Sequence, residues 1–227
     1  VAMDGDDGPA GYLVPQDADS SQPASMLPMQ EFHRLLDALP CRHLLLILDC
    51  CFAGAFRWAG TRHLLGLPTV LYREPYDRFV RDPAWQVLTS AADDQQAFDE
   101  AKRFAIRNDS GDHSPFALAL FEALQGAADL KMRIGGAEPV GDGLITATEL
   151  YAYLREWVET QTIAQNQRQT PGLWPLHKHG KGEFIFRVPG STVALPSAPD
   201  LHINNNPYQG LNAFTQDDAE LFFGRTA

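Results

Sequence analysis

The sequence predicts an α/β domain in which helices flank a mainly parallel central sheet. The main observation is an unbroken aliphatic run, Leu44 to Leu48, which is too short to cross a bilayer and has polar residues on both sides. Such a run is typical of a strand that is buried on both faces, as in the centre of a parallel sheet. Small residues follow at Ala53 and Gly54, which favours a strand over a buried helix. A second strand is predicted at 85–90, WQVLTS.

The composition limits the class of protein. The 227 residues suit one α/β domain with a further segment appended, and 44% apolar residues are ample for a core. A net charge of -11 argues against nucleic acid or an anionic membrane as the main partner. No segment reaches transmembrane length, no leader pattern opens the chain, and the three cysteines form no disulfide framework. We expect a cytoplasmic protein and, because the chain opens at Val1 in a predicted loop, a fragment or processed piece.

The first half of the chain predicts one helix and one long loop around the central strand. Residues 12–15 predict a short strand, and Cys41 is expected to begin the central strand as a small buried hydrophobe. Residues 55–83 are rich in Arg, aromatics and Pro without steady periodicity, which predicts a long loop. Residues 28–39 predict an amphipathic helix whose apolar face carries Phe32, Leu35, Leu36 and Leu39.

Two helix starts can be read in the second half of the chain. Ser114 is the predicted N-cap of a helix that runs to Leu124. Thr146 and Glu149 form a capping box, which opens another helix that extends to about Thr160. A last strand is predicted after these helices, at Phe184-Ile185-Phe186.

Three patterns suggest a metal site, and the spacing of each argues against it. The acidic turn at 4–7 does not keep the EF-hand spacing, so a solvated turn is the better interpretation. Residues 142–149 imitate the second half of an EF-hand loop, but Val140 would occupy a ligand position. His177 and His179 have no third ligand nearby. We therefore predict no metal site.

The motif that carries chemistry is Asp49-Cys50-Cys51, at the end of the predicted central strand. Reactive groups in open α/β sheets collect outside the carboxyl ends of the strands, where a thiol is positioned as a nucleophile would be. A catalytic cysteine also needs a base, which should sit on a neighbouring strand end, distant in sequence. The alternative is a thiol without a catalytic role.

The block LLLILDCCFAG resembles the nucleophile segment of the caspase-like cysteine peptidases, in their bacterial and metacaspase-like branch. The family pattern Asp-(Ser/Cys)-Cys-x-(Ser/Ala)-Gly maps onto Asp49 to Gly54, which would make Cys51, and not Cys50, the nucleophile. The likeness extends to GYLVPQDA, TSAADDQQAFD, HSPFALALFEAL and DGLITATELYAYL. Over residues 1–188 it implies a caspase-like peptidase domain with the three-layer sandwich of that family.

The resemblance also implies groups that lie outside this chain. The family's general base belongs to a His-Gly motif just upstream of a segment like the one that opens at Val1, so the base would precede Val1. Half of the oxyanion hole would be missing with it. We expect an endopeptidase whose fragment, taken alone, is inactive. Phe52 stands where metacaspases usually carry His, at little expected cost.

The position of Asp49 bears on specificity. By resemblance, caspases that cut after Asp carry Gln two residues before the nucleophile, where this chain has Asp49. A buried carboxylate at that position would attract Arg or Lys, so the hypothesis is cleavage after a basic residue. The alternative is that Asp49 only caps the turn after the strand. Asp93, Asp94 and Asp99 fall where the family's loop borders the substrate cleft, and a solvated acidic loop is equally compatible with them. If the enzyme cuts after basic residues, the arginines of 55–83 are predicted self-cleavage sites: Arg57, Arg62, Arg73, Arg78 and Arg81.

The C-terminal part predicts a larger protein. Residues 189–206 have the composition of a linker, and residues 207–227 resemble the entry of the nucleotide-binding module of STAND-type signalling ATPases. The resemblance implies an effector in bacterial defence or programmed cell death, with a peptide substrate and downstream sensor domains as partners. No cofactor is predicted, because calcium is implied by the resemblance alone and not by spacing. Two alternatives stay open: a catalytically silent docking module, and a different Cys-dependent hydrolase with His113 as its base.

Overall fold

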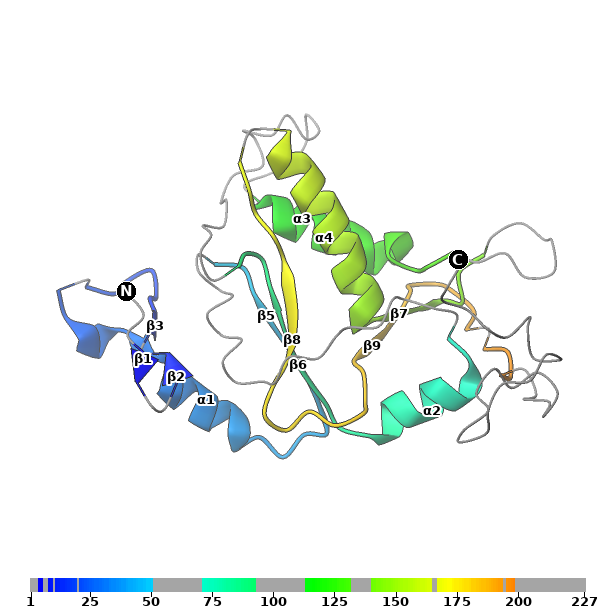
Figure 1. The fold of residues 1–227 in the computed structure, drawn as a ribbon, viewed down its shortest axis with the longest axis horizontal. Coiled ribbons are helices and arrows are strands. Elements are labelled where there is room, and N and C mark those ends of the chain that lie inside the picture. Colours follow the sequence, from blue (N-terminus) through cyan, green and yellow to red (C-terminus); the bar gives the residue numbers. More distant parts are fainter. Residues whose placement is uncertain are drawn as a thin grey trace, which may run out of the picture. The chain divides into compact units, whose positions relative to one another are not determined.

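The computed structural model describes most of the segments that the motifs occupy. The chain divides into two units, Val1–Pro196 and Ser197–Ala227, and every helix and strand below belongs to the first (Figure 1). The described residues are 4–5, 8–9, 11–19, 21–50, 71–92, 113–131, 140–164, 167–193 and 195–198. The predicted segment 207–227 and part of the predicted linker lie outside these residues, so both stay predictions.

A three-stranded sheet lies at the centre of the first unit. It consists of β5 (His43–Leu48), β6 (Ala84–Thr89) and β8 (Gly172–Pro175), in the order β5-β6-β8. β5 and β6 are parallel, whereas β6 and β8 are antiparallel, so the described sheet is mixed and not mainly parallel. The predicted α/β class is confirmed. The sequence did not predict β8, because Pro171 and Pro175 bound it and Pro is tolerated only at strand ends and sheet edges.

The two parallel strands differ in burial. All six residues of β6 are buried, whereas all six residues of β5 are half-buried. The side chains of β5 point alternately into two cores, one on each face of the sheet. Leu45 and Ile47 pack into the first core. The second core receives Leu44, Leu46 and Leu48. β5 is an edge strand of the described sheet, and its outer edge has no strand partner among the described residues.

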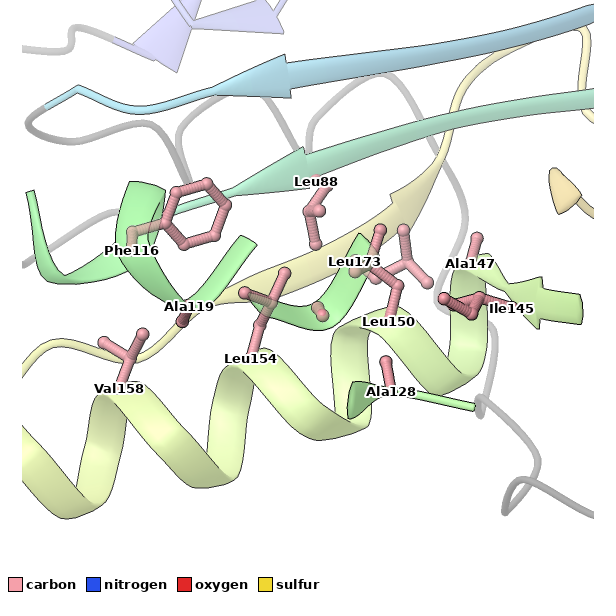
Figure 2. Close-up of a cluster of buried hydrophobic side chains, with 11 residues drawn as sticks. Leu88, Phe116, Ala119, Ala128, Ile145, Ala147, Leu150, Leu154, Val158 and Leu173 are labelled. Atoms are coloured by element: carbon pink, nitrogen blue, oxygen red, sulfur yellow. The ribbon is translucent and has the colours of Figure 1, made fainter. Parts of the chain in front are cut away.

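Two helices cover one face of the sheet. α3 (Pro115–Glu122) and α4 (Ala147–Ile163) pack against each other and against Leu88 of β6 and Leu173 of β8 (Figure 2). α3 continues into the π-helical turn η4 (Ala123–Ala127), which Gly126 ends with a φ of 112°. Figure 2 shows Leu150 and Leu154 pointing from α4 into this core, and complete burial of a leucine contributes about 1.5–3 kcal/mol.

One helix, α1 (Met29–Asp37), contributes to the core of the opposite face. Met29, Phe32 and Leu36 pack into the cluster that contains Trp85, Val87 and Leu176. Of the predicted apolar face, Phe32 and Leu36 therefore pack into the core, whereas Leu35 and Leu39 are exposed.

The prediction of a buried Cys41 was wrong. Cys41 is exposed, because β5 begins two residues later, at His43, and Cys41 lies in the turn before it. Its carbonyl oxygen accepts a hydrogen bond at 3.1 Å from the indole N–H of Trp85.

The predicted loop at 55–83 contains a helix, α2 (Arg73–Arg81). Pro75 lies in its first turn, where the missing N–H costs nothing, and two arginines near its end complement the helix dipole. The imidazole Nε2 of His43 lies 3.2 Å from the carbonyl oxygen of Phe79 and 3.0 Å from that of Asp82, so it closes this end of the helix.

Three short antiparallel pairs complete the described fold. They are β1 (Asp4–Gly5) with β2 (Gly8–Pro9), β3 (Tyr12–Leu13) with β4 (Leu27–Pro28), and β7 (Leu144–Thr146) with β9 (Ile185–Arg187). A 3-10 turn, η1 (Pro23–Ser25), precedes β4. None of the helices in the described ranges is long and apolar enough to span a membrane.

Candidate active site

The carboxyl ends of β5 and β6 meet at one end of the sheet (Figure 1). The carbonyl oxygen of Leu48, the last residue of β5, accepts a hydrogen bond at 2.9 Å from the backbone N–H of Ser90, just after β6. Asp49 and Cys50 follow β5 at this end, where Asp49 is exposed and Cys50 is half-buried. The start of the Asp-Cys-Cys motif thus lies where two parallel strands end together.

The carboxylate of Asp49 is held by the N-cap residue of a helix that is distant in sequence. The hydroxyl of Ser114 donates a hydrogen bond to Oδ2 of Asp49. The same hydroxyl oxygen accepts a hydrogen bond at 2.9 Å from the backbone N–H of Ala117, which makes Ser114 the N-cap of α3, as predicted. A buried hydroxyl therefore connects the end of β5 to the start of α3.

Asp49 was expected to be a buried carboxylate that selects a basic residue, and the expected burial was wrong. Asp49 is exposed because it is the first residue beyond the strand, whereas Ser114, its hydrogen-bond donor, is buried. Water screens an exposed charge, so its attraction for a cation in the free protein is weaker than that of a buried carboxylate. A bound substrate that excludes water would strengthen the attraction.

A network of hydrogen bonds joins Ser90, the residue after β6, to the end of α4. The buried side chain of Gln169 donates a hydrogen bond at 2.9 Å to the carbonyl oxygen of Ser90. The backbone N–H of Gln169 donates at 3.3 Å to the hydroxyl of Thr162, which in turn donates at 2.9 Å to the carbonyl of Val158 on α4. These bonds tie the end of α4 to the end of β6. Within the described part of the chain, the buried hydroxyl of Ser90 has no hydrogen-bond partner.

Two described histidines have structural contacts at the amino ends of the strands. His43 begins β5 and contacts the carbonyls at the end of α2, as described above. Nδ1 of His179 accepts a hydrogen bond at 3.1 Å from the backbone N–H of Trp85, which fixes this nitrogen as unprotonated. His43 lies about 20 Å from Asp49 along β5, since a strand rises about 3.3 Å per residue.

His113 lies next in sequence to Ser114, the hydrogen-bond partner of Asp49. It immediately precedes Ser114 and is exposed. Its ring packs edge-on against Phe121, with 5.4 Å between the ring centroids and an interplanar angle of 79°. This packing gives His113 a structural contact, and its place beside Ser114 keeps it as the candidate base within this chain.

The carboxylates near the start of α4 bind backbone N–H groups. Asp129 accepts from Asp142 and Gly143 at 3.1 and 3.0 Å, and Glu149 accepts from the backbone and hydroxyl of Thr146 at 2.8 and 2.9 Å. Burial raises the pKa of both Asp129 and Glu149, although these hydrogen bonds oppose the shift. Asp142 and Glu183 show the same direction, since burial raises the pKa of each. The EF-hand-like segment therefore builds the cap of α4.

Several predicted site residues cannot be placed. Cys51, Asp93, Asp94 and Asp99 lie outside the described residues, so Asp49 is the one predicted site residue that the structure positions. Sequence reasoning identified Ser114 as a helix cap but not as the partner of Asp49, because a contact across 65 residues leaves no local pattern. It also missed Gln169, which has no periodic or motif signal.

The described residues offer no metal site, and the comparisons with known proteins found no relative. Among the described residues, no group of three or more His, Cys, Asp or Glu side chains is arranged to hold a metal ion. Comparisons with known protein families, with curated proteins and with solved structures gave no match.

Proposed function

We propose that this chain is the peptidase domain of a caspase- or metacaspase-type cysteine endopeptidase. Cys51 is the nucleophile, a histidine upstream of Val1 is the base, and the substrate is cut after Arg or Lys. The observation that carries the proposal is the placement of Asp49 and Cys50 directly after β5, where β5 and the parallel β6 end together. Helices on both faces of the sheet are compatible with the three-layer sandwich of that family.

The proposed reaction is acyl transfer through a thioester. Sγ of Cys51 loses its proton to the imidazole base and attacks the carbonyl carbon of the basic residue. The tetrahedral oxyanion is stabilised by backbone N–H groups, of which the nucleophile's own is one by resemblance. The leaving amine takes the proton from the imidazole, and water then hydrolyses the thioester and restores the thiol.

The open edge of β5 offers a place for the missing base. β5 is apolar and only half-buried, and its outer edge is unpaired among the described residues. An unpaired apolar edge favours the addition of another strand. A strand that precedes Val1 and pairs there in parallel would end beside Asp49 and Cys50, where a base is needed.

Substrate specificity rests on Asp49, with Asp93 and Asp94 as further acidic candidates. The carboxylate of Asp49 is exposed at the strand end, so a basic side chain can reach it. A planar guanidinium matches a carboxylate with two parallel N–H donors, which favours Arg over Lys.

The structure narrows the proposed self-cleavage sites. Arg73 and Arg78 lie within α2, where the peptide carbonyls are bonded within the helix and a nucleophile cannot approach them before the helix unwinds. Arg81 is the last residue of α2, where carbonyls have no partner within the helix, so it stays a proposed site together with Arg57 and Arg62, which lie outside the described residues.

One observation favours a second candidate, the silent docking module. The contact between Asp49 and Ser114 gives the carboxylate a structural role at the start of α3, which needs no catalysis. A docking module would keep this contact and would have no use for Cys51.

The test is peptide hydrolysis by the full-length protein, with peptides that end in Arg, Lys or Asp before a fluorescent leaving group. We expect hydrolysis after Arg that Cys51→Ala abolishes and Cys50→Ala preserves. His113→Ala separates the upstream base from the alternative base, because it should leave kcat unchanged if the base precedes Val1. Preference for Asp peptides would contradict the specificity, and absence of hydrolysis under all activating conditions would favour the docking module.

A further inference from the structure

The contact between Ser114 and Asp49 has a fixed direction. A serine hydroxyl has a single proton and accepts through its lone pairs. The backbone N–H of Ala117 occupies an acceptor site of Ser114 Oγ at 2.9 Å, and the proton is directed at Oδ2 of Asp49. Asp49 is therefore the acceptor.

The two partners differ in their exposure to solvent. Ser114 is buried, begins α3 and is followed by Pro115, so its hydroxyl is held by the helix. Asp49 is exposed in the segment after β5. A hydrogen bond from a fixed group reduces the rotamer freedom of the exposed carboxylate before any ligand arrives. Because the carboxylate of Asp49 is exposed, a basic side chain of a substrate can reach it.

We propose that Ser114 is a positioning residue for substrate recognition, which orients the carboxylate of Asp49 toward the basic side chain of the substrate. The inference rests on the proposed function and deepens it. The start of α3 also places its positive dipole end beside the negatively charged carboxylate, which stabilises that side chain in its place. Ser114 acts through Asp49 and does not itself contact the substrate.

The test compares KM and kcat for an Arg peptide in the full-length protein. Ser114→Ala should raise KM about fivefold, the factor that one hydrogen bond typically contributes, with a smaller change in kcat. Ser114→Asn should keep KM within about twofold, because its amide both accepts from Ala117 and donates to Asp49. In an Asp49→Asn background, Ser114→Ala should change KM no further, since the two residues act as one unit.

The matched control is Thr146→Ala, which removes the N-cap of α4 instead. It should lower stability by a similar amount and leave KM unchanged. If Ser114→Ala does not fold, Ser114→Gly replaces it, because glycine is tolerated at an N-cap far better than alanine is.

The outcomes separate the two proposals. An active wild type whose KM is unmoved by Ser114→Ala or Ser114→Gly would overturn the role of Ser114 and leave the peptidase proposal intact. An equal rise in KM for Thr146→Ala would also overturn it, because the effect would then be general destabilisation. A wild type that hydrolyses no Arg peptide would overturn the specificity and the role of Ser114 together.

Discussion

The helices α3 and α4 pack side by side on one face of the sheet, yet their first turns are capped in different ways. At α4 the cap is local: the Thr146 hydroxyl accepts from the backbone N–H of Glu149, and the Glu149 carboxylate accepts from the backbone N–H and the hydroxyl of Thr146. At α3 the first turn contains no acidic residue, and the carboxylate comes from Asp49 on another element. The first cap stabilises one helix, whereas the second also fixes a strand end.

This difference separates what a cap contributes to stability from what it contributes to the site. Both helices have an N-cap hydroxyl, and loss of either hydroxyl should destabilise the fold by about 1 kcal/mol. Only the α3 cap should also alter the geometry of the candidate active site. Variants at the two caps can therefore distinguish a shared structural effect from a site effect.

The largest effect is expected from a charge placed in the α3 cap. Ser114→Asp keeps a good N-cap side chain, but it cannot donate to Asp49 and sets a second negative charge against it. Two unit charges about 4 Å apart interact with about 1 kcal/mol in water and about 4 kcal/mol near a protein surface. We expect Ser114→Asp to lower the free energy of unfolding by about 2 kcal/mol relative to Ser114→Asn, measured by urea denaturation.

Salt provides the control for this prediction. Because the destabilisation is a repulsion between partly exposed charges, 1 M NaCl should reduce the difference between Ser114→Asp and Ser114→Asn. Equal stability of the two variants at low salt would mean that the contact between Ser114 and Asp49 is not maintained in solution.

A smaller effect is expected at the α4 cap. Thr146→Ala removes the hydroxyl that accepts from Glu149 N–H and donates to the Glu149 carboxylate. We expect a loss of about 1 kcal/mol in the free energy of unfolding, the typical value for N-cap removal, and near-complete recovery in Thr146→Ser. A Thr146→Ser variant as unstable as Thr146→Ala would show that the methyl group of Thr146, and not its hydroxyl, stabilises this turn.

Local patterns predicted those parts of the fold whose causes are local. The capping box at Thr146 and Glu149 and the cap at Ser114 are confirmed, because each depends on residues within one helical turn. β8 was missed, since Pro171 just before it and Pro175 at its end argue against a strand unless its position at the edge of the described sheet is known. α2 was also missed, because its carbonyl-terminal end is completed by His43, which lies far away in sequence.

The candidate site was less predictable than the fold around it. The sequence located Asp49 at the end of a strand, but its exposure depends on how the strand end meets solvent and could not be read from the aliphatic run. The partner of Asp49 comes from a helix 65 residues away. Contacts of this kind depend on the packing of β5 against the layer that contains α3, which no motif encodes.

The smallest effect concerns pH, and it applies to the α4 cap. Burial raises the pKa of Glu149 above its ordinary value of 4.5, so the folded protein binds the proton more tightly than the unfolded chain does. The contribution of this group to stability is therefore greatest below about pH 4.5 and is lost as the pH rises through the raised pKa. Glu149→Gln keeps a side chain suited to the capping box and should flatten this pH dependence.

The comparison between variants isolates Glu149 from its neighbours. Asp129, Asp142 and Glu183 also have a pKa raised by burial, so the pH dependence of the wild type alone cannot be assigned to one group. As the pH rises from 4 to 7, the free energy of unfolding of the wild type should fall relative to that of Glu149→Gln. Thr146→Ala should steepen the dependence, because the hydroxyl that lowers the pKa of Glu149 is gone. Ser114→Asn should leave the pH dependence of the free energy of unfolding unchanged, because the first turn of α3 contains no carboxylate. If Ser114→Asn changed this pH dependence as much as Glu149→Gln does, the two caps would not be independent.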